Sequence, residues 1–149
     1  MTSQPKSNRA RSFARSLAMQ AQYQQQLDDT SRAQLLAQFS ERREYERVDA
    51  EYFEMLVNES MRLLPELQED ITEFADRDIE QLGLVEIAVL RIALTEMRSR
   101  IDVPFRVVIN EAVDLTHRFG AESAHKYVNA VLDRAAQKHR AVEARAARS

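Results

Sequence analysis

Three arginines near the amino terminus have the type and spacing to bind an anion. Arg9, Arg11 and Arg15 precede or open a predicted helix, where free backbone N–H groups and the helix dipole already favour negative charge. Acidic residues are usual in a first turn, so arginines there indicate an anionic partner that offsets the mismatch. The planar guanidinium also suits bidentate contact with phosphate. These residues favour nucleic-acid binding, and an ordinary solvated charged surface is the alternative.

A lysine and a tyrosine side by side, Lys126 and Tyr127, form a second candidate site within the stretch FGAESAHKYVNAVLD. On a helix they share a sector about 100° wide with Ser123 and Ala130. Single-stranded RNA is bound by such a combination, because bases stack on aromatic rings while cations hold phosphates. From this segment alone, packing of Tyr127 on the edge of the core, with Lys126 in solvent, is the simpler interpretation.

The sequence offers little support for catalysis. The histidines, His117, His125 and His139, lack the HExxH spacing of a zinc site. Neither a glycine-rich phosphate loop nor a G-x-S-x-G elbow is present. The chain has no cysteine, which excludes disulfides and thiolate chemistry. We therefore expect no enzyme, no metal and no other cofactor.

The elements that hold these residues are predicted to be helical throughout. Only two glycines and three prolines occur, too few for the turns of a β protein, and no segment alternates with period two. We expect an all-α fold, a compact bundle of about seven helices that can divide into two sub-bundles near residues 40–48. A single domain is expected over 8–136, between a disordered basic tail, 1–7, and an Arg-rich tail, 137–149.

The most apolar segment, residues 82–97, predicts the centre of the bundle. Its sequence, LGLVEIAVLRIALTEM, leaves almost no polar face, which is typical of a helix buried on all sides. Glu86 and Arg91 are two of its few polar positions. The following helix is expected to carry Phe119 on its inner face. Gly120 suits the position just after that helix, where a positive φ is needed.

Charge and hydropathy limit the possible locations and partners. The first 27 residues carry four basic residues and no acidic one, whereas residues 28–80 carry sixteen acids against six arginines. Such segregation suggests an anionic partner near the termini, although solubility is an alternative reason for surface charge. No apolar run reaches the ~18 residues that span a bilayer, and the start, MTSQPKSNRARS, is unlike a signal peptide. We expect a cytoplasmic protein without a membrane partner.

Two segments of the chain resemble the NusB family of transcription antitermination factors. LGLVEIAVLRIALTEM, followed by DVPFRVVINEAVDLTHRFGAESAHKYVNAVLDRAA, is similar to the carboxy-terminal half of that family. RARSFARSLAMQAQYQQQL is similar to its Arg-rich opening helix. The resemblance covers nearly all of residues 9–136 and is loose over about 30–75. It implies an all-helical RNA-binding protein that catalyses no reaction.

The resemblance also implies partners. NusB proteins pair with NusE, a ribosomal protein, and bind boxA-type single-stranded RNA in ribosomal RNA leaders, which helps RNA polymerase to read through termination signals. We therefore expect boxA-type RNA, NusE and the RNA polymerase antitermination complex as partners. Family members can also self-associate as dimers, and the sequence leaves monomer and dimer open. One alternative is a helical protein–protein adaptor or obligate homodimer without a direct RNA role. Another, an RNA methyltransferase carrying a NusB-like domain, is not expected because no methyl-donor-binding fold follows.

Carried over residue by residue, the resemblance implies one RNA-binding strip formed by both ends of the chain. The arginines would contact phosphate, and the aromatic ring of the Lys–Tyr pair would lie against RNA. The expected members are Arg9, Arg11, Arg15, Tyr23, Glu86, Arg91, Lys126 and Tyr127. Two departures from the family pattern are Ser12 and Phe13, which interrupt a run of arginines, and Ser123, which replaces a common acid.

Overall fold

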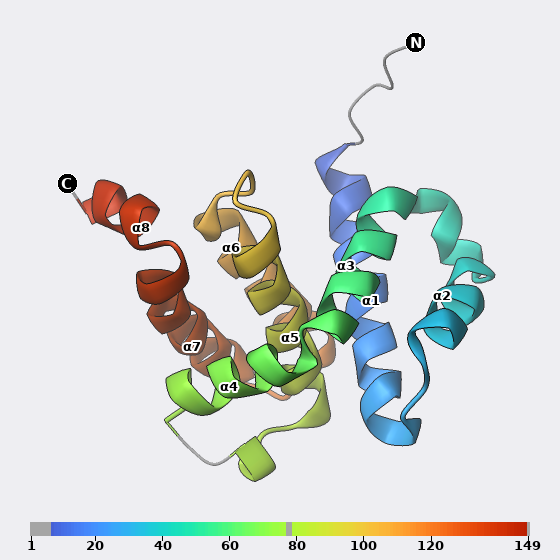
Figure 1. Cartoon of the computed structure of the whole chain (residues 1–149), viewed down its shortest axis with the longest axis horizontal. Coiled ribbons are helices and arrows are strands. Elements are labelled where there is room, and N and C mark those ends of the chain that lie inside the picture. Colours follow the sequence, from blue (N-terminus) through green and yellow to red (C-terminus); the bar gives the residue numbers. More distant parts are fainter. Residues whose placement is uncertain (1–6, 77–78, 149) are drawn as a thin grey trace.

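The computed structural model describes residues 7–76 and 79–148, and its regular elements are helical (Figure 1). Within those ranges there is no strand, which confirms the all-α prediction. The described residues form eight α-helices rather than the expected number of about seven, because the carboxy-terminal region forms one more. They are α1 (Asn8–Asp28), α2 (Arg32–Ser40), α3 (Ala50–Arg62), α4 (Leu64–Phe74), α5 (Leu84–Ser99), α6 (Phe105–Phe119), α7 (Ala124–His139) and α8 (Ala141–Arg148). Two short 3-10 helices, η1 (Arg43–Arg47) and η2 (Ile79–Gln81), complete the set.

Helix α5 is the central element, as its composition predicted. Ala88, Val89, Leu90 and Leu94 are fully buried, and α5 packs against α1, α3, α4, α6 and α7. Figure 1 shows α1, α2 and α3 on one side of α5, with α6, α7 and α8 on the other. The buried central helix is therefore confirmed, but the expected division near residues 40–48 is wrong, because α3 follows that segment and packs against α1 and α2.

Side-chain caps explain where several helices begin. The Ser7 hydroxyl accepts a hydrogen bond from the backbone N–H of Ala10, and α1 begins at Asn8, immediately after Ser7. Ser31 and Gln34 form a capping box at α2, and the Asp49 carboxylate accepts from the N–H of Tyr52 at the start of α3. Each cap satisfies an N–H group that the first turn leaves without a helical partner.

The turn between α6 and α7 differs from the sequence expectation. Gly120 has an extended backbone, with φ of −92°, so the predicted positive φ is wrong. Glycine is needed there for space, because a Cβ would lie 2.9 Å from the carbonyl oxygen of Thr116. The left-handed residue is Ser123 instead, with φ of 71°, immediately before α7.

The carboxy-terminal region continues the fold beyond the expected boundary at residue 137. Helix α7 runs through that boundary to His139, and Ala144 in α8 is buried. Arg140 lies between α7 and α8 and is 3% exposed. Its guanidinium donates to the carbonyl oxygens of Met97, Val103 and Arg100. A buried cation thus satisfies carbonyl groups that the end of α5 leaves without helical partners. Residues 1–6 of the expected amino-terminal tail lie outside the described residues.

None of the described helices is both long enough and apolar enough to cross a membrane.

Candidate nucleic-acid interface

Helix α1 presents two different sides, and the three amino-terminal arginines divide between them. Arg9 is exposed, and its guanidinium lies over the ring of Phe13, 5.5 Å from the ring centroid. Arg11 and Arg15 point instead toward α3, where both lie over the ring of Tyr52. A helix advances by about 100° per residue, so residues two and six positions apart need not share a surface.

Arg15 lies inside the protein. It is 4% exposed, and it donates two hydrogen bonds to the carboxylate of Glu96, at 2.7 and 3.0 Å. A second carboxylate, that of Glu111, lies 3.2 Å away. Burial alone would lower the pKa of Arg15, but the Glu96 carboxylate outweighs burial and raises it. The Arg15 guanidinium is therefore committed to carboxylates that hold α1 against α5 and α6.

Arg11 lies at the edge of the same cluster and keeps access to solvent. Its side chain is one-third exposed, and its Nε is 3.8 Å from the Asp49 carboxylate. Its guanidinium covers the Tyr52 ring at 4.5 Å from the centroid. The Arg11 cation can thus be reached from outside, unlike that of Arg15.

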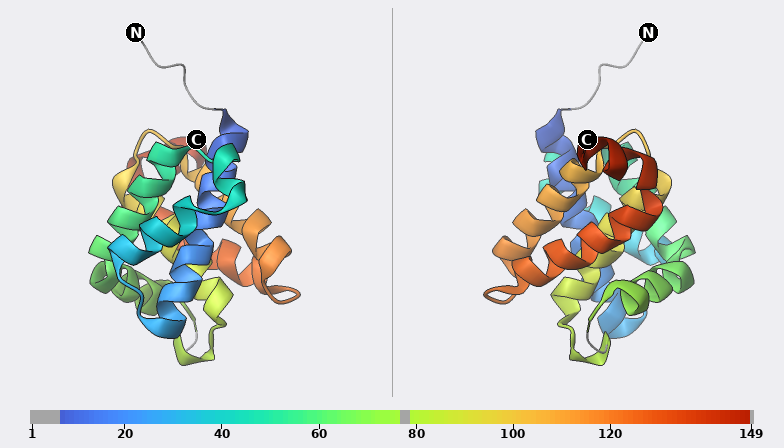
Figure 2. Two further views of the ribbon diagram at one scale, coloured as in Figure 1. Left: turned by 90° about the vertical axis from the view of Figure 1, so that its right-hand side faces the viewer. Right: turned by 90° about the vertical axis from the view of Figure 1, so that its left-hand side faces the viewer.

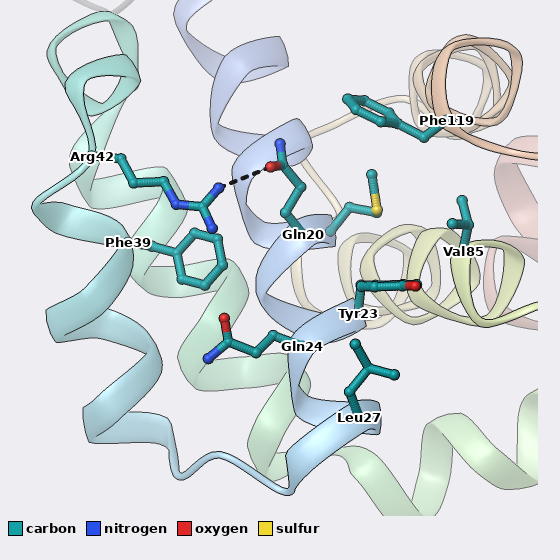
Figure 3. A pocket seen from close by; sticks show the side chains of 9 residues that line it. Gln20, Tyr23, Gln24, Leu27, Phe39, Arg42, Val85 and Phe119 are labelled. Carbon is teal, nitrogen blue, oxygen red and sulfur yellow. Dashed lines mark hydrogen bonds between the residues drawn. The ribbon is translucent and has the colours of Figure 1, made fainter.

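Tyr23 borders a groove on a different side of α1. The ring is 36% exposed, and it lines a cavity of about 370 Å³ together with Leu27 of α1 and Val85 of α5. Phe119, at the end of α6, closes the groove across from Gln20 (Figure 3). Phe119 was predicted on the inner face of its helix, and that prediction is wrong, because the ring is 40% exposed.

The two expected site residues of α5 lie mainly inside. Glu86 is 9% exposed, and its carboxylate lies beside Gly83 at the start of the helix. The helix dipole favours a negative charge at that position. Arg91 is half-buried and donates to the side-chain oxygens of Gln22 and Gln25, at 3.0 and 2.8 Å. Burial lowers the pKa of Arg91. These contacts tie α5 to α1.

Lys126 and Tyr127 begin α7 as a mixed pair. Lys126 is exposed, whereas Tyr127 is half-buried and packs against the hydrophobic core. Beside them, the imidazole rings of His117 and His125 stack with centroids 4.0 Å apart. Partial burial lowers the pKa of His125, and the nearby side chains of His117 and Lys126 lower it further. This end of the bundle therefore gathers cationic and aromatic groups.

The structure brings the second half of α1 and the end of α6 to the same side of the bundle. Phe119 is the last residue of α6 and faces Tyr23 across the groove, and the turn that follows leads directly to Lys126. Figure 2 (left) shows this turn projecting beside the lower part of α1, with the start of α7 behind it. Arg9 lies at the other end of α1. Arg9 and Tyr23 therefore share one side of α1 and Arg11 lies on another, while Arg15 and Glu86 lie within.

The groove itself was missed by sequence reasoning. Its walls come from the end of α6 and from Phe39 and Arg42 near η1, segments far apart in the sequence. One signal was available, since Tyr23, Gln24 and Leu27 recur at helical spacing on a side of α1 without a predicted neighbour. Over the described residues, no three His, Asp or Glu side chains are placed to hold a metal ion.

Comparison with known proteins gives a consistent set of relatives. A sequence model of the NusB family matches residues 12–137. The chain is 46% identical over 133 residues to the transcription antitermination protein NusB of Xanthomonas axonopodis pv. citri (strain 306), covering 89% of this chain and 84% of the relative. It is 42% identical over 140 residues to the protein of that name from Alcanivorax borkumensis, covering 94% and 93%.

Solved structures agree with the sequence relatives. NusB of T. maritima superposes with a TM-score of 0.78 at 26% identity, covering 93% of this chain and 94% of the other. A chain in the crystal structure of antitermination factors NusB and NusE in complex with dsRNA superposes with a TM-score of 0.72 at 28% identity, covering 86% and 96%.

Proposed function

Because the chain belongs to the NusB family, we propose that it is a transcription antitermination factor that binds RNA together with a NusE protein. Its RNA would be of the boxA type, in ribosomal RNA leaders, and its effect would be read-through by RNA polymerase. Support comes from relatives named as transcription antitermination proteins and from a similar chain seen with NusE and RNA. The role is one of binding and assembly in the cytoplasm, without catalysis.

One observation carries the RNA-binding part of this proposal. Arg9 and Tyr23 are exposed on one side of α1, where Tyr23 faces Phe119 at the end of α6. Lys126 is exposed seven residues beyond Phe119, and Arg11 is partly exposed on the side of α1 toward α3. Cations placed along a surface hold phosphates, and exposed rings accept stacked bases. The proposal adds the half-buried ring of Tyr127, next to Lys126, to the residues that meet RNA.

The remaining expected residues take supporting roles in the proposal. Arg15 anchors α1 to α5 and α6 through the Glu96 and Glu111 carboxylates. Arg91 anchors the middle of α1 to α5 through two glutamine side chains, and Glu86 lies over the start of α5. Replacing them would affect RNA binding by moving α1, not by removing a contact with RNA.

A titration of labelled boxA-type RNA, with and without NusE, tests the proposal. We expect the chain to bind this RNA, with higher affinity when NusE is present. A scrambled RNA of the same length is the control for charge alone, and the scrambled strand should bind more weakly at each salt concentration. Light scattering in the same solutions reports the oligomeric state. A stable dimer that refuses boxA-type RNA even with NusE would contradict the proposal and favour an adaptor role.

A further inference from the structure

One side of α1 is an unbroken stripe of side chains from the start of the helix to its end. Positions 9, 13, 16, 20, 23 and 27 recur every three or four residues and therefore share one side of the helix. At 1.5 Å per residue the stripe is about 27 Å long. It has Arg9 at one end and Tyr23 with Leu27 at the other, all three exposed, whereas Ser16 between them is buried.

Two adjoining cavities lie along this stripe and form a single groove. The first, of about 380 Å³, lies against Phe13 and Ser16. The second, of about 370 Å³, lies against Tyr23 and contains the side chains drawn in Figure 3. Both are lined by Gln20 and Phe119, so the cavities meet where the end of α6 approaches the middle of α1. We call the two together the α1 groove.

Arginines lie over three aromatic rings that line the α1 groove, of which Phe119 is exposed, Phe13 is half-buried and Phe39 is buried. Arg9 lies over Phe13 at 5.5 Å from the ring centroid. Arg42 lies over Phe39 at 4.0 Å and donates to the Gln20 side-chain oxygen at 3.0 Å. The guanidinium of Arg118 lies over the ring of its neighbour Phe119 at 5.0 Å.

The charge of the groove favours an anionic occupant. Among the described residues that line the two cavities, Glu44 is the one acid, against Arg42, Arg47 and Arg118. Proteins that bind single-stranded nucleic acid combine a positively charged groove with aromatic rings on which bases stack. A groove made to receive an apolar protein segment would not need an arginine beside each of three rings.

We propose that the α1 groove holds successive unpaired bases of the RNA strand, with the exposed ring of Phe119 as a stacking platform at its midpoint. Arg118 and Arg42 would hold the phosphates on the two walls, and the amides of Gln20 and Gln24 would meet base edges within the cavity. This inference rests on the proposed function and extends it to residues outside the expected site. It also gives Tyr23 a partner across the groove, so that two rings face the same strand.

Alanine substitution of Phe119 tests the platform directly. Loss of one base-stacking ring costs affinity for single-stranded RNA by about 5- to 150-fold, so Phe119→Ala should weaken binding of labelled boxA-type RNA by at least about fivefold. Phe119→Trp keeps an aromatic face and should restore most of the affinity. Ile101→Ala is the matched control, because Ile101 is an apolar residue, 83% exposed, that does not line the groove. Thermal melting of each variant confirms that the fold is intact.

Photocrosslinking with 4-thiouridine in the same RNA gives a second readout. Crosslinked peptides should contain Tyr23 or Phe119. The inference is overturned if Phe119→Ala binds RNA as tightly as Ile101→Ala does while Tyr127→Ala loses affinity, since RNA would then bind outside the groove. It is also overturned if Phe119→Ala weakens binding of NusE and leaves RNA binding unchanged, which would make the groove a protein site. Failure of the unsubstituted chain to bind RNA with NusE contradicts the proposed function itself.

Discussion

On one side of α1, Arg15 is 4% exposed and lies between the carboxylates of Glu96 and Glu111. On the other side, Arg9 is exposed and lies over the ring of Phe13. The two residues share a helix and a charge, yet only the second can meet a phosphate without breaking the fold. Exposure and neighbours, rather than residue type, therefore separate an arginine that stabilises the bundle from one that binds a partner.

The largest effect is expected from Arg15→Ala. Removing one partner of a buried ion pair leaves an uncompensated charge and costs about 3–5 kcal/mol, here at the Glu96 carboxylate. The free energy of unfolding, measured by urea denaturation, should fall by that amount. Arg9→Ala is the matched control and should change stability by less than about 0.5 kcal/mol. Equal losses for the two variants would remove the distinction between the two sides of α1.

A second large effect is expected from Arg140→Ala. Its guanidinium donates to four carbonyl oxygens at the end of α5 and in the following turn, and each hydrogen bond to a charged group is worth about 1.5–3 kcal/mol. We expect stability to fall by about 2–4 kcal/mol, allowing for partial access of water to the freed carbonyls. The control is Arg145→Ala, an exposed arginine of α8. If Arg140→Ala left the free energy of unfolding unchanged, the carboxy-terminal region would not contribute to the stability of the fold.

An intermediate effect is expected at the start of α7. Tyr127→Ala should weaken binding of boxA-type RNA by about 1–3 kcal/mol through lost stacking. Tyr127→Phe retains the ring and serves as the control. Because Tyr127 also packs against the core, urea denaturation must accompany the RNA titration. A loss of stability without a loss of affinity in the folded protein would assign Tyr127 to packing alone.

The smallest effect concerns pH and a buried ion pair far from α1. Burial alone would raise the pKa of Asp70, but hydrogen bonds from Arg98 and His139 outweigh it and hold the pKa below 3.8, its ordinary value. A depressed pKa means that the stability from this pair is present above about pH 4 and is lost as pH falls through the folded pKa. Urea midpoints between pH ~6 and ~2 should show this loss, and Asp70→Asn should reduce it. An unchanged pH dependence in Asp70→Asn would contradict the assignment.

Local features of the fold could be predicted from the sequence because their causes are local. Asp49 caps α3 by accepting a hydrogen bond from the first turn of that helix. The apolar residues around Leu90 require burial on all sides, so α5 is central. Gly120 was expected to supply a positive φ, but its role is to avoid a clash with Thr116. That distinction depends on how the chain continues to Ser123, which a single-residue preference does not report.

The site could be predicted only in part, because exposure depends on distant residues. Arg11 and Arg15 are four residues apart and share one side of α1, but the carboxylate that buries Arg15 comes from Glu96, on another helix. The α1 groove depends on where α6 ends. Nothing near Tyr23 in the sequence shows that Phe119 will face it.

The salt dependence of RNA binding tests the central claim most directly. Each phosphate contact contributes about 0.7 to the slope of log affinity against log salt for a single strand. With NusE present, Arg9→Ala and Arg11→Ala should each lower the magnitude of that slope by about 0.7. Arg62→Ala, at an exposed arginine of α3 paired with Glu59, should leave it unchanged. Slopes that do not differ among the three variants and the unsubstituted chain would contradict the account.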